Sequence, residues 1–137
     1  MTAVFRAPMR ARDHDAPPGA GAEFGLAHGL VGIGDPAEAR IRRLAELPDG
    51  VFVWTRDTAG DFWLGRVAGP LRRAPRNAAG LTHVRRADWL DRPYGADDVP
   101  ADVAATFARG GRNLQRTHGA AVERRTAELW AATAPTA

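Results

Sequence analysis

Residues 51–67, with the sequence VFVWTRDTAGDFWLGRV, have the pattern of a β-hairpin. Aromatic and β-branched residues fill the segments 52–55 and 62–67, and residues 57–60, DTAG, have the composition of a turn. If these four residues form the loop, Arg56 faces Asp61 and Trp54 faces Trp63 on the neighbouring strand. The sequence therefore predicts a hairpin with two tryptophans side by side.

The two faces of this hairpin differ in character, because side chains alternate along a strand. In the predicted register one face is mainly aliphatic and is formed by Val51, Val53, Phe62 and Leu64. The opposite face is aromatic and is formed by Phe52, Trp54 and Trp63, together with Gly65. The aliphatic face suits a core, and the aromatic face is a candidate stacking platform for a flat ligand. This interpretation depends on the loop length, since a shift of one residue would separate the two tryptophans.

Length and composition restrict the class of protein. For 137 residues we expect one domain over 1–137, with residues 7–22 as a loose loop and residues 134–137 as a tail. Cysteine is absent, which excludes disulfides and thiolate metal sites. No apolar run has the length of a membrane span or of a signal peptide, so we expect a cytoplasmic protein without a membrane partner.

All 19 basic side chains are arginine, although the formal net charge is only +3. Arginines far outnumber acidic residues between positions 56 and 86. Arginine binds phosphate with a planar fork and stacks on bases, so this stretch is a candidate nucleic-acid surface. The expected backbone contacts are Arg66, Arg72, Arg73, Arg76, Arg85 and Arg86. Codon bias in a GC-rich genome is an alternative explanation for the choice of arginine, and a charged edge that prevents aggregation is another.

The segments before the hairpin predict two strands and a helix. Residues 2–6 suit a short strand, and residues 26–34 have the pattern of a buried strand that leads into a helix. Asp35, Pro36 and Glu38 have the spacing of an N-cap, a first helical residue and a capping box. Residues 48–50, PDG, end this helix before the hairpin begins.

The segments after the hairpin predict one more strand and two helices. The strand covers residues 81–90, and a short helix follows from Pro100 to the glycines at 110 and 111. The last helix begins near Leu114 or Gly119 and ends at Thr133. This order predicts an α+β fold with a small, curled, mostly antiparallel sheet and flanking helices.

The residue types that carry catalysis are scarce in this chain. Serine and cysteine are both absent, which excludes covalent catalysis through either side chain. The four histidines do not have the spacing to carboxylates that is typical of metal motifs. We therefore expect no catalytic residue, no metal and no cofactor.

Three runs of sequence resemble a known superfamily. The runs GVFVWTR at 50–56, GDFWLGRVAGP at 60–70 and THVRRADWL at 82–90 are similar to motifs of the PUA-like superfamily, in particular EVE-like domains related to YTH domains. The resemblance covers roughly residues 25–118 and implies a curled β-barrel of five or six strands with flanking helices. It also implies a reader without catalytic activity, in which an extruded and often modified base enters an aromatic pocket.

This resemblance also implies which residues form the base pocket. They come from the hairpin and from the glycine-rich turn before the first predicted helix: Trp54, Thr55, Arg56, Trp63, Gly32, Ile33, Gly34 and Asp35. Many relatives have an aromatic residue where this chain has Asp35 and Pro36. The cage therefore either lacks one wall or uses Asp35 to accept a hydrogen bond from an exocyclic amino group.

The expected function is recognition of a methylated cytosine or adenine, with DNA favoured over RNA. In a restriction or defence system, the nuclease would be a separate subunit. Stacking on an aromatic side chain contributes about 1 to 3 kcal/mol per base, which offsets the similar free energy needed to extrude it. The alternative is a small-molecule or protein-interaction module that uses the same tryptophan face.

Overall fold

A computed structural model describes residues 2–11, 16–35, 37–110 and 113–133. The strands are β1 (Val4–Arg6), β2 (Leu30–Ile33), β3 (Phe52–Arg56), β4 (Phe62–Arg73), β5 (His83–Trp89) and β6 (Gln115–Arg116). The helices are α1 (Ala20–His28), α2 (Glu38–Glu46), the 3-10 turn η1 (Ala96–Asp98), α3 (Ala101–Arg109) and α4 (Ala120–Thr133).

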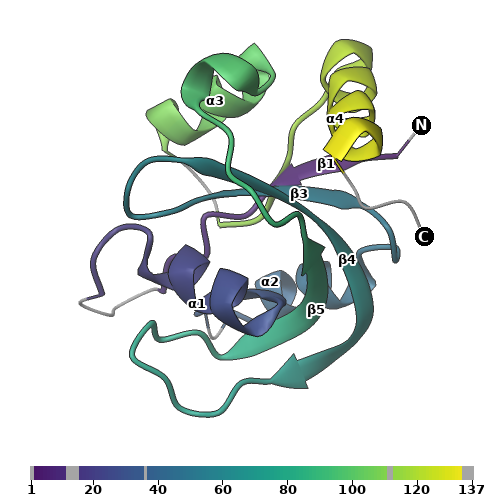
Figure 1. The fold of residues 1–137 in the computed structure, drawn as a ribbon. Helices are drawn as coiled ribbons and strands as arrows, with labels where there is room; N and C mark the ends of the chain where they lie inside the picture. The colour runs from purple at the N-terminus through teal and green to yellow at the C-terminus, as the bar shows by residue number, and fades with distance from the viewer. Residues whose placement is uncertain (1, 12–15, 36, 111–112, 134–137) are drawn as a thin grey trace.

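The six strands form one mixed sheet in the order β2-β5-β4-β3-β1-β6. Every neighbouring pair is antiparallel except β1 and β3, which are parallel. In Figure 1 the long strand β4 curves strongly; α3 and α4 lie on one side of the sheet, and α1 and α2 lie on the other. The predicted α+β class and the curled, mostly antiparallel sheet are therefore confirmed.

The sheet does not close into a barrel, which differs from the barrel that the resemblance implies. Among the described residues, one isolated parallel bridge, between Ala11 and Gly34, joins the segment after β1 to the end of β2. One bridge cannot supply the continuous ladder of hydrogen bonds that closure requires. The sheet thus curls toward closure and remains open.

The predicted hairpin is present, but its register differs from the prediction by one residue. Trp54 pairs with Leu64, and Thr55 pairs with Trp63. The loop has five residues instead of four, because the Asp57 amide donates to the Asp61 carbonyl at 2.9 Å and the Asp61 amide donates to the Asp57 carboxylate at 2.9 Å. The prediction that Trp54 faces Trp63 is therefore wrong.

This register divides the hairpin residues between two apolar clusters, one on each face of the sheet. Val51, Val53 and Val67 belong to the cluster that α1 and α2 cover. Phe52, Trp54, Phe62 and Leu64 belong to the cluster under α3 and α4. The predicted division into one aliphatic core face and one open aromatic face is wrong, because both faces are buried.

The segment before β2 is more ordered than its composition predicts. Helix α1 occupies residues 20–28 in a stretch predicted to be a loop up to residue 22 and a strand from residue 26. Gly21 and Gly25 lie against Met9, where an added Cβ would come within 2.9 Å of its side chain. Small residues therefore let α1 pack closely on the buried Met9, and this tertiary contact overrides the weak helix propensity of glycine.

The other predicted helices are confirmed. Helix α2 begins at Glu38 with Ala37 as its N-cap, so the predicted N-cap at Asp35 and its capping box with Glu38 are wrong. The Asp35 carboxylate instead accepts a hydrogen bond from the Ala37 amide at 2.8 Å, and Pro36 lies outside the described residues. Helix α3 ends at Gly110, and α4 begins directly after Gly119. Among the described helices, none has the length and apolar character needed to cross a membrane.

Gly65 has a structural role that differs from its expected one. An added Cβ at Gly65 would lie 2.6 Å from the indole ring of Trp89, so the missing side chain leaves space for this ring. Trp89 is held there by a hydrogen bond from its Nε1 to the Leu30 carbonyl at 3.2 Å. Gly65 therefore packs β4 against a tryptophan of β5 and does not leave space for a ligand.

The buried hydrogen bond between Trp54 Nε1 and Thr126 Oγ1, at 3.2 Å, yields a test of the register. Thr126→Val leaves the indole N–H without its partner in the core, and we expect it to lower the free energy of unfolding by about 1 to 3 kcal/mol. Arg124→Gln, at an exposed position of the same helix, should change it by about 0.5 kcal/mol or less. Chemical denaturation measures both, and equal effects would contradict the observed burial of Trp54.

Candidate functional site

The two hairpin tryptophans do not line a common cavity. Trp54 is completely buried, and its ring packs edge-on against Tyr94 with centroids 5.7 Å apart. Trp63 lies on the other face and is half-buried, with its Nε1 donating to the Asp57 carboxylate at 2.8 Å. Both indole N–H groups are satisfied within the protein. The predicted aromatic stacking platform is therefore wrong.

The glycine-rich segment assigned to the base pocket is also buried. Gly32, Ile33, Gly34 and Asp35 are all inaccessible, and β2 is separated from β3 by two strands of the sheet. Added Cβ atoms at the two glycines would approach the backbone carbonyls of the neighbouring segment to 2.5 Å or less. A cavity of only about 10 Å³ lies beside Ile33 and Asp35. These glycines permit close backbone packing and leave no space for a base.

Asp35 is occupied by structural contacts. Its carboxylate accepts from the Ala37 amide and forms an ion pair with Arg40 at 2.7 Å. Thr55 is completely buried as well, although its Oγ1 has no hydrogen-bond partner. Arg56, in contrast, is exposed. Of the residues predicted to form the base pocket, it is the one that lines a large opening in the described part of the chain.

Two of the arginines predicted to contact a nucleic-acid backbone make contacts within the fold. Arg85 is buried; it donates to the carbonyls of Leu44 and Leu47 at the end of α2 and pairs with Asp49 at 2.6 Å. Arg66 is half-buried, and its guanidinium lies beside the rings of Phe52 and Trp130, 4.8 and 5.6 Å from their centroids. The assignment of Arg85 as a backbone contact is therefore wrong, because this side chain is buried, and the assignment of Arg66 stays a prediction.

The remaining arginines of this set are accessible. Arg72, Arg73, Arg76 and Arg86 are exposed, and Arg86 forms a loose ion pair with Asp88 at 3.5 Å. Arg73 and Arg76 border a shallow hollow of about 400 Å³ at the β4–β5 loop. This basic loop, which we define as residues 72–76, keeps its predicted exposure.

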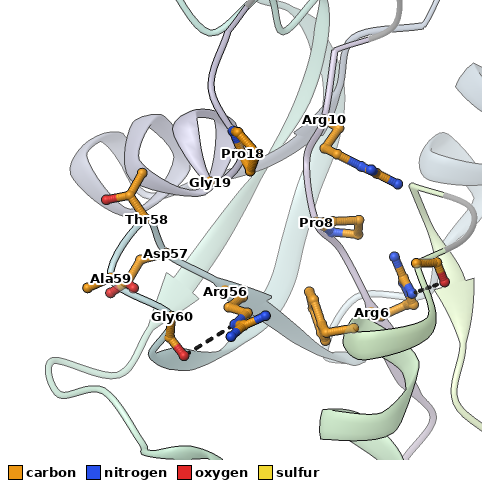
Figure 2. A pocket seen from close by; sticks show the side chains of 12 residues that line it. Arg6, Pro8, Arg10, Pro18, Gly19, Arg56, Asp57, Thr58, Ala59 and Gly60 are labelled. Carbon is orange, nitrogen blue, oxygen red and sulfur yellow. Dashed lines mark hydrogen bonds between the residues drawn. The ribbon is translucent and has the colours of Figure 1, made fainter.

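A second basic pocket lies beside the β3–β4 loop. Its volume is about 410 Å³, and it is formed by the segment after β1, the β3–β4 loop and the end of α3. Figure 2 shows Arg6, Pro8 and Arg10 along one side and residues 57–60 along the other, with Arg56 between them. We call this opening the arginine pocket; its lining includes Arg6, Arg10 and Arg56, together with Pro8, Pro18 and Phe107.

Arg6 is the buried member of the arginine pocket. It is 2% exposed, and its Nη1 donates to the carbonyls of Thr106 and Gly110, the latter at 2.8 Å. Its guanidinium also lies 5.1 Å from the centroid of the Phe107 ring. These contacts connect β1 to the C-terminal end of α3, where carbonyl groups lack helical partners.

The electrostatic environment of Arg6 is positive. Burial lowers the pKa of Arg6 from its ordinary value, and repulsion by Arg10 and Arg109 lowers it further. Arg56, at the mouth, donates to the Gly60 carbonyl at 3.2 Å and has no carboxylate partner among the described residues. Asp57 is the acidic residue among the described lining residues, and both of its oxygens accept hydrogen bonds, from Asp61 and Trp63. In the described lining, arginines therefore outnumber acidic side chains.

Arg6 and Arg10 are pocket residues that the sequence did not indicate. The place of Arg6 depends on the parallel pairing of β1 with β3, in which it lies opposite Trp54, and the backbone of Arg10 is held by two hydrogen bonds with the Asn113 side chain. Parallel neighbours that are distant in sequence leave no local signal. The alternation within β1 was a usable signal, because it places Arg6 on the same buried face as Val4.

Comparison with known proteins adds no assignment: no family model matches the chain, and no curated protein matches it. Within the described ranges, no three histidine or acidic side chains gather as a metal ion would require. The resemblance to PUA-like domains accordingly remains a prediction from the three motifs.

Arg85 and Arg86 are adjacent and offer a matched test of which arginines are structural. Arg85→Gln removes the partner of the α2 carbonyls and should lower the free energy of unfolding by about 3 kcal/mol. Arg86→Gln, at an exposed position, should change it by about 0.5 kcal/mol or less. Denaturant titration distinguishes the two. Equal stability of both variants would contradict the buried network around Arg85.

His83 lies opposite Arg73 in the β4–β5 ladder and provides a reporter for the basic loop. Partial burial and then repulsion by Arg73 lower the pKa of His83. The unfolded chain therefore binds a proton at His83 more readily than the folded chain does. The contribution of His83 to the free energy of unfolding is present above the unfolded pKa of about 6.5, and it is lost as the pH falls from that value through the lower pKa of the folded state. NMR titration should give a lowered value for His83, and Arg73→Gln should raise it. An unchanged value in this variant would contradict the role of Arg73.

Proposed function

We propose that this protein is a nucleic-acid-binding domain without catalytic activity, and that it accommodates one extruded nucleotide in the arginine pocket. The observation that carries the proposal is the pocket itself. Arginines from two separate segments, represented by Arg6, Arg10 and Arg56, border a volume of about 410 Å³. That volume lies within the range of about 300 to 1,000 Å³ found for small-ligand sites, which includes the size of a nucleotide.

The chemistry of the lining supports this ligand class. Arginine binds phosphate with parallel hydrogen bonds and also stacks on the face of a base. Pro8, Pro18 and Phe107 supply apolar surface for a flat ring. A polar rim with an apolar wall is typical of sites that hold a base and its phosphate together.

The basic loop supports a contact with the rest of the strand or duplex. Arg72, Arg73 and Arg76 are exposed and lie on a part of the molecule different from the arginine pocket. Contacts of this kind contribute affinity without sequence preference and weaken with salt. In this proposal the arginine pocket selects the nucleotide, and the basic loop holds the backbone.

From the resemblance to EVE-like domains we further propose that the extruded base is modified, and that the ligand is DNA in preference to RNA. The pocket that supports the proposal differs from the one that the resemblance implies, because Trp54 and the β2 glycines are buried. A methyl group against Pro8, Pro18 or Ala59 would add about 1 kcal/mol of apolar burial, which gives preference without absolute selectivity.

Fluorescence anisotropy with short labelled duplexes and single strands, carrying plain or methylated cytosine and adenine, tests the proposal. Arg56→Ala should reduce affinity and also any preference for the modified base. The double variant Arg72→Ala with Arg73→Ala should weaken all oligonucleotides alike and lower the salt dependence, by about one unit of slope for each phosphate that these arginines bind.

The matched control is Arg124→Ala, at an exposed position on α4, which should bind as the wild-type protein does. Equal loss of affinity in this variant and in Arg56→Ala would show that binding follows total charge only. Absence of binding to every oligonucleotide at low salt would refute the proposed function.

A further inference from the structure

Arg6 carries a buried positive charge that has no carboxylate partner among the described residues. Its guanidinium hydrogen-bonds to two backbone carbonyls, and no carboxylate pairs with it in the part of the chain that the structure describes. Its Nε is buried and has no hydrogen-bond partner. A buried charge that lacks a counter-charge is costly, and carbonyl and aromatic contacts offset only part of this cost.

Arg85 provides an internal comparison. It is equally buried, at 2% exposure, and it also donates to the carbonyls at the end of a helix. Unlike Arg6, it pairs with a carboxylate, that of Asp49, at 2.6 Å. Arg6 and Arg85 are thus both buried arginines that bind the carbonyls at the end of a helix. In the described part of the chain, Arg85 has a carboxylate as its counter-charge and Arg6 does not.

The position of Arg6 indicates where its counter-charge would come from. Arg6 lines the arginine pocket, which Arg10 and Arg56 also border, and Asp57, the acidic side chain among the described lining residues, is held by internal hydrogen bonds. An anion in this pocket would lie beside the buried Arg6, where charge interactions are stronger than in water, and within reach of the exposed arginines of the lining.

We propose that a phosphoryl group of the ligand occupies the arginine pocket and supplies the missing counter-charge of Arg6. The inference rests on the proposed function only for the identity of the ligand, a nucleotide. A phosphodiester within a nucleic-acid strand carries one negative charge and two unesterified oxygens, whereas the phosphate of a free mononucleotide carries nearly two charges and three such oxygens, and either can supply the counter-charge. Phosphate suits the site better than a carboxylate, because its tetrahedral arrangement of oxygens can accept from arginine forks that approach from different directions.

Binding of this kind is coupled to folding. Only the folded chain brings Arg6, Arg10 and Arg56 together, so a phosphate that binds there raises the melting temperature according to its concentration and affinity. The effect is specific to the phosphoryl group if chloride at the same ionic strength does not reproduce it. The ligand therefore stabilises the fold at the point where an internal charge is unbalanced.

Thermal unfolding of the whole protein tests the inference with inorganic phosphate, pyrophosphate, a 5′-mononucleotide and its nucleoside, each at ionic strength matched with sodium chloride. The compounds that carry phosphate should raise the melting temperature, and the nucleoside should not. Arg56→Gln and Arg10→Gln, both at exposed positions, should each weaken mononucleotide binding about tenfold by calorimetry, the loss expected for one charged hydrogen bond.

Arg124→Gln on α4 is the control and should respond as the wild-type protein does. Arg6→Met should lose the response to phosphate if it folds, and the two exposed variants test the site independently of this one. Equal melting temperatures in phosphate and chloride for the wild-type protein would overturn the inference, as would full retention of mononucleotide affinity in both Arg56→Gln and Arg10→Gln.

The outcomes separate this inference from the proposed function. Oligonucleotide binding without any stabilisation by phosphate would refute the inference and leave the proposed function intact. Stabilisation by phosphate and mononucleotide, without binding to any oligonucleotide, would support the inference, refute the proposed function and identify a free nucleotide as the source of the phosphoryl group.

Discussion

Asp57 joins the two ends of the β3–β4 loop through its backbone and both of its carboxylate oxygens. Its amide and one oxygen bond to Asp61, and the other oxygen accepts from Trp63. These bonds fix a five-residue loop and hence the register of the whole hairpin. The register places Trp54 in the core and turns Trp63 to the opposite face, and the arginine pocket forms beside this same loop.

Much of the fold follows from the sequence, because its helices and strands have strong local signals. The residues that end α2, the glycines around α3 and α4, and the β-branched runs of β3, β4 and β5 are consistent with the observed elements. The N-cap predicted at Asp35 is not, because Ala37 is the residue before α2. The errors arose where a local pattern had two solutions. The DTAG segment suits loops of either four or five residues, and helix α1 depends on contact with Met9, which its composition does not reveal.

The candidate site was less predictable than the fold, because exposure decides which arginines can bind a ligand. Arg85 and Arg86 are neighbours in sequence, yet one is buried at the end of α2 and the other is exposed. Arg6 reaches the pocket through a parallel strand pairing that composition cannot indicate. Charge density along the sequence therefore does not distinguish the arginines that line the pocket from those that hold the fold together.

The hydrogen bond between Arg6 and Gly110 joins positions 104 residues apart in the chain. During synthesis this contact therefore cannot form until residue 110 has emerged, and contacts between residues so distant in the sequence form slowly. A partly folded molecule could hold much of the central sheet and still lack this contact. Its arginine pocket would then be incomplete, because Phe107 and Gly110 belong to the lining.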